Sequence, residues 1–253
     1  MSTGEKVRGG VRMAANNAYC MDCMEYMKTL PDNAFDLAVV DPPYGIGENP
    51  RKALSRARST NKWKNAKPVH YAGGDWDNER PDAEYFNELF RVSRNQVIWG
   101  ANYFTRFLPP SMGWIAWYKK GQSPNSDFSD CEFAYTSFNK ASKYFDFPWV
   151  GFGAVNAKEK RIHNTQKPVA LYRWIYKNYA KQGDKILDTH LGSGSSRIAA
   201  WDAGLDFVGT EIDETYFNLQ EERFKKHIAQ PRLEMFEQQL EMFEQQAEQE
   251  RLF

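Results

Sequence analysis

Four consecutive residues, Asp41, Pro42, Pro43 and Tyr44, place a carboxylate, two proline carbonyls and an aromatic ring directly after an apolar run. The run, residues 35–40, is typical of a buried parallel strand, and the prolines end it because they fix φ and donate no backbone hydrogen bond. An amino group on a heterocyclic base is a weak nucleophile, because its lone pair is delocalised into the ring. The Asp41 carboxylate and the Pro42 carbonyl could accept its two N–H bonds, and Tyr44 could stack on the ring. The pattern alone also fits a strand that ends in a turn with a surface tyrosine.

A second group of chemically suggestive residues lies in the C-terminal half. A short predicted strand ends at Asp188 and leads into Gly192 and Gly194, and the following strand ends at Glu211. Glycine lets the backbone approach a ligand closely, and an acid at the end of the next strand can accept hydrogen bonds from both hydroxyls of a ribose. These residues predict a nucleoside site. The turn alone would also fit a nicotinamide-dependent oxidoreductase, but Arg197 stands where the dinucleotide pattern has a third small residue.

Asp22 is a third candidate, because it follows the first predicted strand and precedes a predicted helix. Its carboxylate could accept a hydrogen bond from a ligand amine, or it could cap the N-terminus of that helix. The sequence leaves both interpretations open.

Strands and helices alternate over most of the chain, which indicates an α/β fold. Two strand–helix–strand units, one in each half, place the candidate residues at the carboxyl ends of strands, where ligands bind in open α/β sheets. The predicted strands cover 14–20, 35–40, 96–100, 113–118, 131–138, 185–188 and 207–210, and the predicted helices cover 21–30, 81–94, 168–180, 198–203 and 213–228.

The charges are unevenly distributed although the net formal charge is zero. Residues 51–67 contain seven basic residues and no acid, whereas residues 211–250 are rich in glutamate. A local positive arm of this kind is the footprint expected for contacts to the phosphates of a nucleic acid. A solvated loop would have the same composition.

The cysteine count argues against a disulfide framework, since there are only three. Cys20 and Cys23 have CxxC spacing, but zinc needs two further ligands, and only Cys131 and four dispersed histidines remain, so we expect no metal site. The sequence shows no signal peptide and no long apolar run, so we expect a cytoplasmic protein without a membrane partner.

The pairing of Asp41–Tyr44 with a downstream Gly-x-Gly turn resembles the DNA amino-methyltransferases that use S-adenosylmethionine, and specifically their β class. His163–Pro168 resembles the stretch that begins the cofactor half of that class, and Ile186–Ser196 resembles its Asp-x-x-x-Gly-Ser-Gly motif. The resemblance covers residues 14–228. It implies a doubly wound, mostly parallel, Rossmann-like methyltransferase sheet with permuted motif order, inserted target-recognition loops and a helical C-terminal tail.

The resemblance also implies a role for each candidate residue. The target amine would be held by Asp41, Pro42, Pro43 and Tyr44. Asp188, Gly192 and Gly194 would line the methionine end of the cofactor. Glu211 would bind its ribose and Asp22 its adenine. Thr165 and Lys167 would close over the methionine carboxylate. Thr189 and His190 replace a Pro-Phe pair that is common in the family, and we expect His190 to pack or form hydrogen bonds rather than act as a base.

The expected substrate is a base flipped out of double-stranded DNA. An aspartate before Pro-Pro-Tyr favours N6 of adenine by resemblance. The alternatives are N4 of cytosine, an RNA or protein amide, and the oxidoreductase reaction named above.

We expect two domains, a catalytic domain over 1–230, with candidate DNA-contact loops at 46–74 and 121–162, and a helical tail over 231–253. The tail repeats a seven-residue unit, which places apolar residues at the a and d spacing of a helical seam. Two heptads are marginal alone, so the tail should dock on the domain or associate with a second copy into a homodimer.

Overall fold

The computed structural model describes residues 14–46, 80–119, 129–149, 159, 161–163 and 165–230. The basic run 51–67 and the heptad tail lie outside these residues, as do 47–74, 121–128, 150–158 and 160 of the candidate DNA-contact loops.

The described residues form one eight-stranded sheet in the order β1-β8-β7-β2-β3-β5-β4-β6. Its strands are parallel except that β5 runs antiparallel to both β3 and β4. The strands are β1 (Asn16–Cys20), β2 (Phe35–Val40), β3 (Ser93–Trp99), β4 (Trp114–Tyr118), β5 (Cys131–Thr136), β6 (Lys143–Asp146), β7 (Lys185–Asp188) and β8 (Asp206–Glu211).

The strand order reverses between β2 and β7, which are hydrogen-bonded neighbours at the middle of the sheet. From β2 the chain continues to one side through β3, and from β7 it continues to the other side through β8. Such a reversal is a topological switch point, and ligands of doubly wound sheets bind at the carboxyl ends of the strands that flank it. The expected doubly wound, mostly parallel sheet is therefore confirmed.

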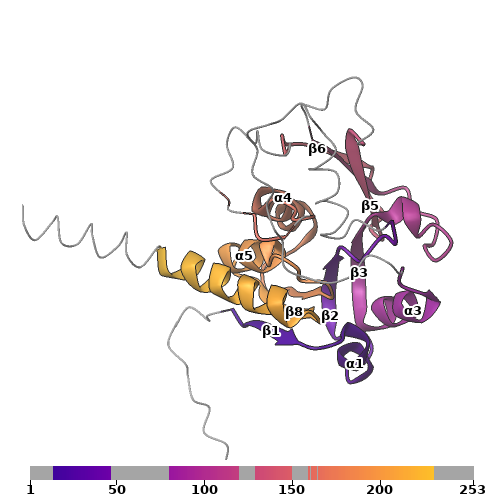
Figure 1. The fold of residues 1–253 in the computed structure, drawn as a ribbon. Helices are drawn as coiled ribbons and strands as arrows, with labels where there is room; N and C mark the ends of the chain where they lie inside the picture. Colours follow the sequence, from indigo (N-terminus) through magenta and orange to yellow (C-terminus); the bar gives the residue numbers. More distant parts are fainter. Residues whose placement is uncertain are drawn as a thin grey trace, which may run out of the picture.

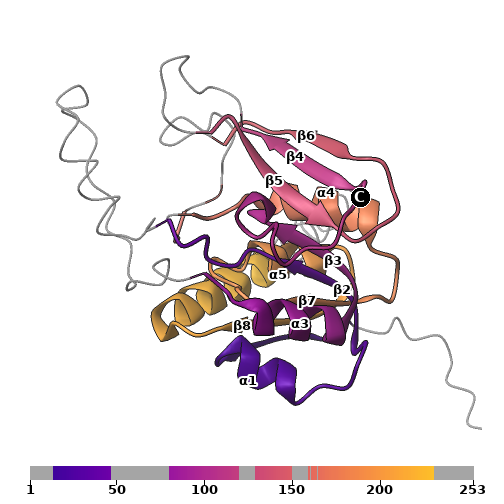
Figure 2. The ribbon, with the colours of Figure 1, turned by 90° about the vertical axis from the view of Figure 1, so that its right-hand side faces the viewer.

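Helices cover both faces of the sheet (Figures 1 and 2). In Figure 2, α1 (Cys23–Lys28) and α3 (Ala83–Val92) lie on the side toward the viewer, and α4 (Val169–Tyr179) and α5 (Ser195–Asp202) lie on the side away from the viewer. A helix over 214–230 packs beside α5, where Phe224 meets Trp201 edge to face.

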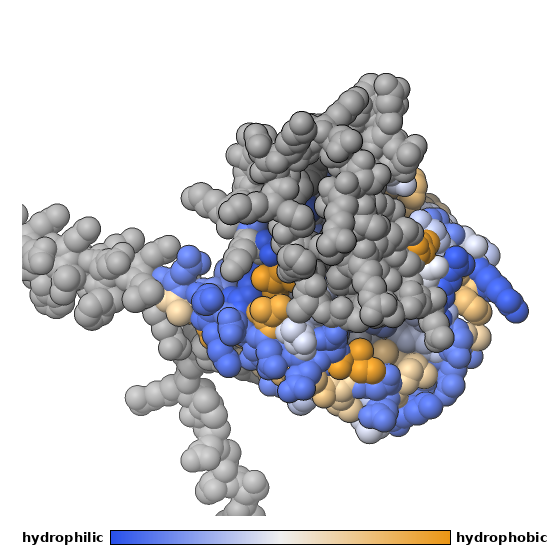
Figure 3. Space-filling view, in the orientation of Figure 1, coloured by the Kyte–Doolittle hydropathy of each residue, from blue (hydrophilic) through white to orange (hydrophobic). Residues whose placement is uncertain are grey.

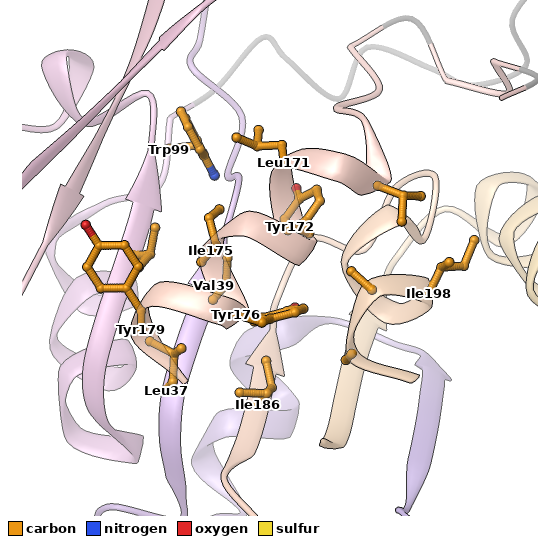
Figure 4. Packing of buried hydrophobic residues seen from close by; sticks show 14 of the residues in the cluster. Leu37, Val39, Trp99, Leu171, Tyr172, Ile175, Tyr176, Tyr179, Ile186 and Ile198 are labelled. Carbon is orange, nitrogen blue, oxygen red and sulfur yellow. The ribbon is translucent and has the colours of Figure 1, made fainter. Parts of the chain in front are cut away.

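The central strand β2 is buried on both faces and joins two hydrophobic cores. Leu37 and Val39 belong to the core under α4, while Ala38 and Val40 belong to the core under α1 and α3. Figure 4 shows the first core, in which α4 lays an apolar face, including Ile175, across the central strands. This two-sided burial explains why β2 is continuously apolar from Leu37 to Val40 rather than alternating.

The sequence missed β6, because residues 139–162 show no strand periodicity. This strand pairs in parallel with β4 beyond the antiparallel part of the sheet, and its residues are largely exposed. The helix α5 also starts earlier than expected, at Ser195, because Gly194 adopts a left-handed conformation (φ 72°) that ends the preceding turn.

Apolar residues form small separate patches among hydrophilic ones on the described surface in Figure 3. None of the helices in the described ranges combines the length and the apolar character needed to cross a bilayer.

Candidate active site

Three acids predicted to act on ligands lie where parallel strands end at the same edge of the sheet. Asp188 and Glu211 are the last residues of β7 and β8, and Asp41 directly follows β2. The register between β2 and β7, with Ala38 opposite Leu187, brings Asp41 and Asp188 to neighbouring strand ends. The Asp41 charge helps to raise the pKa of Asp188, as expected for carboxylates that face the same space.

Asp41 is held by two side chains, one on each carboxylate oxygen. The Tyr44 hydroxyl donates a hydrogen bond to Oδ1 (2.6 Å), and the Lys167 ammonium forms an ion pair with Oδ2. Burial raises the pKa of Asp41, while Lys167 and the Tyr44 hydroxyl act in the opposite direction. The side chain is 18% exposed, so a ligand can still reach it.

Pro42 is buried and Pro43 is half-buried, and β2 ends at Val40 as predicted. The two prolines thus form the stiff turn that separates Asp41 from Tyr44.

The Tyr44 ring is fixed by aromatic neighbours and by a glycine. It stacks on Tyr103, with centroids 5.1 Å apart, and meets Phe104 edge on. A Cβ built on Gly100 would come within 2.0 Å of a Tyr44 ring carbon, so the absence of a side chain at Gly100 creates the space for the ring. The sequence predicts Tyr44 as a stacking partner for a ligand, whereas in the structure it already stacks on Tyr103.

Arg80 binds the backbone of the turn over Asp41–Tyr44. Its Nε donates a hydrogen bond to the Tyr44 carbonyl oxygen (2.9 Å), and its guanidinium lies over the Tyr103 ring at 5.9 Å. Arg80 and Gly100 were not predicted as site residues. Gly100 follows a strand and precedes an aromatic residue, but this signal alone does not point to Tyr44.

Lys167 is buried next to the predicted amine site. Its side chain is only 4% exposed, and its ammonium contacts Asp41, the Tyr44 hydroxyl (3.1 Å) and Glu132 Oε2 (3.2 Å). The family resemblance assigns Lys167 to the carboxylate of the cofactor, but here the ammonium lies on the side of the predicted amine site. Glu132 was not predicted, and its one sequence signal is a charge within the otherwise mostly apolar strand β5.

The predicted nucleoside turn is tied to the end of β8. Gly192 and Gly194 have φ values of 49° and 72°, and Glu211 accepts a hydrogen bond from the Gly192 amide (2.7 Å). A Cβ on Gly192 would meet nothing closer than 3.9 Å, so a ligand has room to approach its backbone.

Asp188 is buried below this turn. It accepts hydrogen bonds from the Ser196 hydroxyl and the His190 amide (3.1 Å). Burial, together with the nearby Asp41 and Glu211 carboxylates, raises the pKa of Asp188 to about 7.

In the structure, Asp22 caps the N-terminus of α1, which is the second of its two predicted roles. Its Oδ1 accepts hydrogen bonds from the amides of Met24 (2.7 Å) and Glu25 (3.1 Å) and so starts α1. The residue still lies next to Glu211, because the Met21 amide bonds to the Glu211 carbonyl oxygen.

Thr165 and His190 are held by hydrogen bonds within the protein. The Thr165 hydroxyl lies 3.0 Å from His163 Nδ1, and the Thr189 hydroxyl bridges His190 Nδ1 (2.9 Å) and the Tyr85 hydroxyl (2.7 Å). Burial lowers the pKa of His190 to about 4, so its imidazole is neutral near pH 7.

The family model and the curated relatives that match this chain are DNA methyltransferases. A family model for DNA methylases of the N6/N4 type matches residues 92–222, just over half of the chain. The Type II methyltransferase M.HpaI of Haemophilus parainfluenzae is 23% identical over 249 residues, which cover 81% of this chain and 72% of that protein.

Solved structures share the fold. The putative DNA modification methylase TTHA0409 of Thermus thermophilus, in complex with S-adenosyl-L-methionine, aligns with a TM-score of 0.53 and 16% identity, covering 84% of this chain and 94% of that one. The PvuII DNA methyltransferase, which is cytosine-N4-specific, aligns with a TM-score of 0.50 and 12% identity, covering 85% and 92%.

Proposed function

Because the chain belongs to the family of N6/N4 DNA methylases, we propose that it methylates N6 of adenine in double-stranded DNA. Family membership establishes the coarser reaction, the transfer of a methyl group from S-adenosylmethionine to an exocyclic amino nitrogen of a DNA base. The observation that carries the adenine proposal is an aspartate, rather than a serine, at the start of the Pro-Pro-Tyr turn.

The residues around the turn after β7 fit the cofactor. S-adenosylmethionine, when bound, supplies a methyl group on a positively charged sulfur, and buried carboxylates favour that charge. We assign Asp188, Gly192 and Gly194 to the methionine end of the cofactor, Glu211 to its ribose and Asp22 to its adenine. The open space above Gly192 and the acid at the end of β8 support these assignments.

Thr165 and Lys167 are proposed to face the methionine carboxylate from the segment before α4. A cation suits that carboxylate. The contact between Lys167 and Asp41 would then link the cofactor to the amine site.

The four residues from Asp41 to Tyr44 are proposed to hold the target amine. The base must leave the duplex, which costs a few kcal/mol. The cofactor would supply the methyl carbon and would leave as a neutral thioether as the new C–N bond forms. The target nitrogen would take the positive charge and then lose one N–H proton to the Asp41 carboxylate, which would release it to water. Asp41, with the Pro42 carbonyl, accepts the N–H bonds and holds the nitrogen in line with the methyl group.

Mass spectrometry of nucleosides tests the choice of base. Purified protein is incubated with S-adenosylmethionine and mixed double-stranded DNA, which is then digested to nucleosides. We expect N6-methyldeoxyadenosine, and a product consisting of N4-methyldeoxycytidine would overturn the adenine assignment.

Three further parts of the proposal concern partners and location. The candidate DNA-contact loops are expected to bind the duplex, the tail over 231–253 to support a homodimer, and the protein to act in the cytoplasm. Competition between DNA and RNA substrates tests the first, and light scattering on a chain that ends at Gln230 tests the second.

A further inference from the structure

Four charged side chains of alternating sign lie in a row that ends at the amine site. Lys119 pairs with Glu132, Glu132 pairs with Lys167, and Lys167 pairs with Asp41. Each residue comes from a different segment: the end of β4, the middle of the sheet at β5, the stretch before α4, and the end of β2. Most of the surface of each side chain is buried, with exposed fractions from 4% for Lys167 to 25% for Glu132.

Glu132 is the member of this row that faces inward without a role in the reaction as described above. Its Oε2 atom is buried and lies 3.2 Å from the Lys167 ammonium, and it has no hydrogen-bond partner of ideal geometry among the described residues. A buried carboxylate is costly unless it is paired, and here Oε1 pairs with Lys119 while the buried Oε2 faces the Lys167 ammonium.

We propose that Glu132 is a positioning residue for methyl transfer, which shares the Lys167 ammonium with Asp41 and thereby leaves Asp41 free to accept the N–H bonds of the target amine. The inference rests on the proposed function of Asp41.

The physical reason is the balance of charge at Lys167. With two carboxylates beside it, the ammonium divides its donors between Asp41 and Glu132. Without Glu132, a larger share of its charge would fall on Asp41, because Tyr44 offers only a neutral hydroxyl. A carboxylate in a tight one-to-one ion pair is a weaker acceptor, so the amine would be less activated.

The groups around Asp41 set the direction of the pH effect. Lys167 and the Tyr44 hydroxyl lower the pKa of Asp41, while burial and Glu132 raise it. Asp188 from β7, Tyr85 from α3 and Tyr172 from α4 are the other titratable groups that interact with it electrostatically. Removing the Glu132 charge therefore lowers the pKa of Asp41.

The test is the Glu132→Gln variant of the full chain, assayed for DNA methylation across pH. We expect kcat to fall about three- to tenfold, as for a weakened base, and the acid limb of the kcat/KM profile to move to lower pH. A role confined to folding would reduce the active fraction without moving that limb. A wild-type kcat with an unmoved limb, or a limb that moves to higher pH, would overturn the proposal.

Two further variants keep the result interpretable. The Lys119→Met/Glu132→Gln double variant removes a pair of opposite charges, so it remains folded if the single variant does not, and it should show the same two changes. Glu222→Gln, on the exposed surface of the last helix, is the control and should behave as wild type. If Asp41→Ala remains active, the proposed function of Asp41 fails. If Asp41→Ala is inactive while both Glu132 variants match wild type, only the inference about Glu132 fails.

Discussion

The Lys167 ammonium contacts the Asp41 carboxylate although the two residues are 126 positions apart in the chain. Asp41 directly follows β2 and begins the predicted amine site, and Lys167 precedes α4 at the start of the half that carries the predicted cofactor site. The ion pair therefore joins the two halves at the switch point of the sheet, and several expectations follow from the packing around it.

Gly100→Ala should impair catalysis through Tyr44. The new methyl group would overlap the Tyr44 ring, which would have to leave its stacked position on Tyr103 and its hydrogen bond to Asp41. We expect kcat for DNA methylation to fall at least about tenfold, because misplacement of a reacting group by about 1 Å is costly. Steady-state kinetics with a DNA substrate measure it.

Gly183→Ala is the matched control for that variant. Both glycines have positive φ, 66° and 88°, so both substitutions strain the backbone, but nothing lies within 4 Å of a Cβ on Gly183. Thermal denaturation should show a loss of stability for both, larger for Gly100→Ala because its methyl group also overlaps the Tyr44 ring, whereas Gly183→Ala should keep the wild-type kcat. Equal loss of kcat in both variants would show that Gly100 matters only for stability.

Affinity for S-adenosylmethionine should depend on the protonation of Asp188. The cofactor is positively charged and favours the ionised carboxylate, whose pKa in the free protein is about 7. The affinity for S-adenosylmethionine should therefore reach its maximum above the pKa of Asp188. Below that pKa it should decrease by up to about tenfold per pH unit. Calorimetry between about pH 5.5 and about pH 8.5 measures this. His163 and His190, with pKa values lowered to about 4, remain neutral over that range.

Ser196→Ala supplies the control for the pH dependence. The Ser196 hydroxyl donates a hydrogen bond to Asp188 and lowers its pKa, so its removal should shift the midpoint to higher pH. An affinity that does not change with pH in either protein would contradict the assignment of Asp188 to the cofactor.

Arg197→Met should destabilise the fold rather than the chemistry. Its guanidinium donates to Asn16 (2.7 Å) and Gln220 (3.0 Å), pairs with Glu221 and lies 4.0 Å from the Phe224 ring centroid. Loss of a buried partner should lower the free energy of unfolding by about 2–4 kcal/mol in urea denaturation.

Arg173→Met is the comparison for Arg197. Arg173 also pairs with an acid, Asp202, but its side chain is about half exposed. Its replacement should cost less than about 1 kcal/mol. Similar losses for the two arginines would show that Arg197 does not fasten α5 to the last helix.

The fold could be predicted from the sequence where burial leaves a plain pattern. The strand at Phe35–Val40 is apolar except for Asp36 because both of its faces are covered, and the strand at Lys185–Asp188 is followed by a glycine turn. The edge strand β6 could not be predicted, because its residues are largely exposed and mix basic, aromatic and acidic types.

The candidate site was predictable only in its local motifs. Asp41, Asp188 and Glu211 follow from their positions at strand ends. Glu132 and Gly100 do not, because each acts on a residue far away in the chain, and the sequence carries no sign of which strands become neighbours. The role of Arg197 could not be predicted either. In the sequence it only interrupts the glycine pattern, whereas in the structure it binds Gln220 and Glu221 on the last helix.

The central claim, that Asp41 accepts the target amine, is tested most directly by the Asp41→Ala variant, which removes both acceptor oxygens. The measurement is transfer of labelled methyl from S-adenosylmethionine to DNA, with cofactor affinity determined by calorimetry on the same preparation. We predict that methylation is abolished while cofactor affinity stays near that of the wild type. Methylation at an undiminished rate would contradict the account.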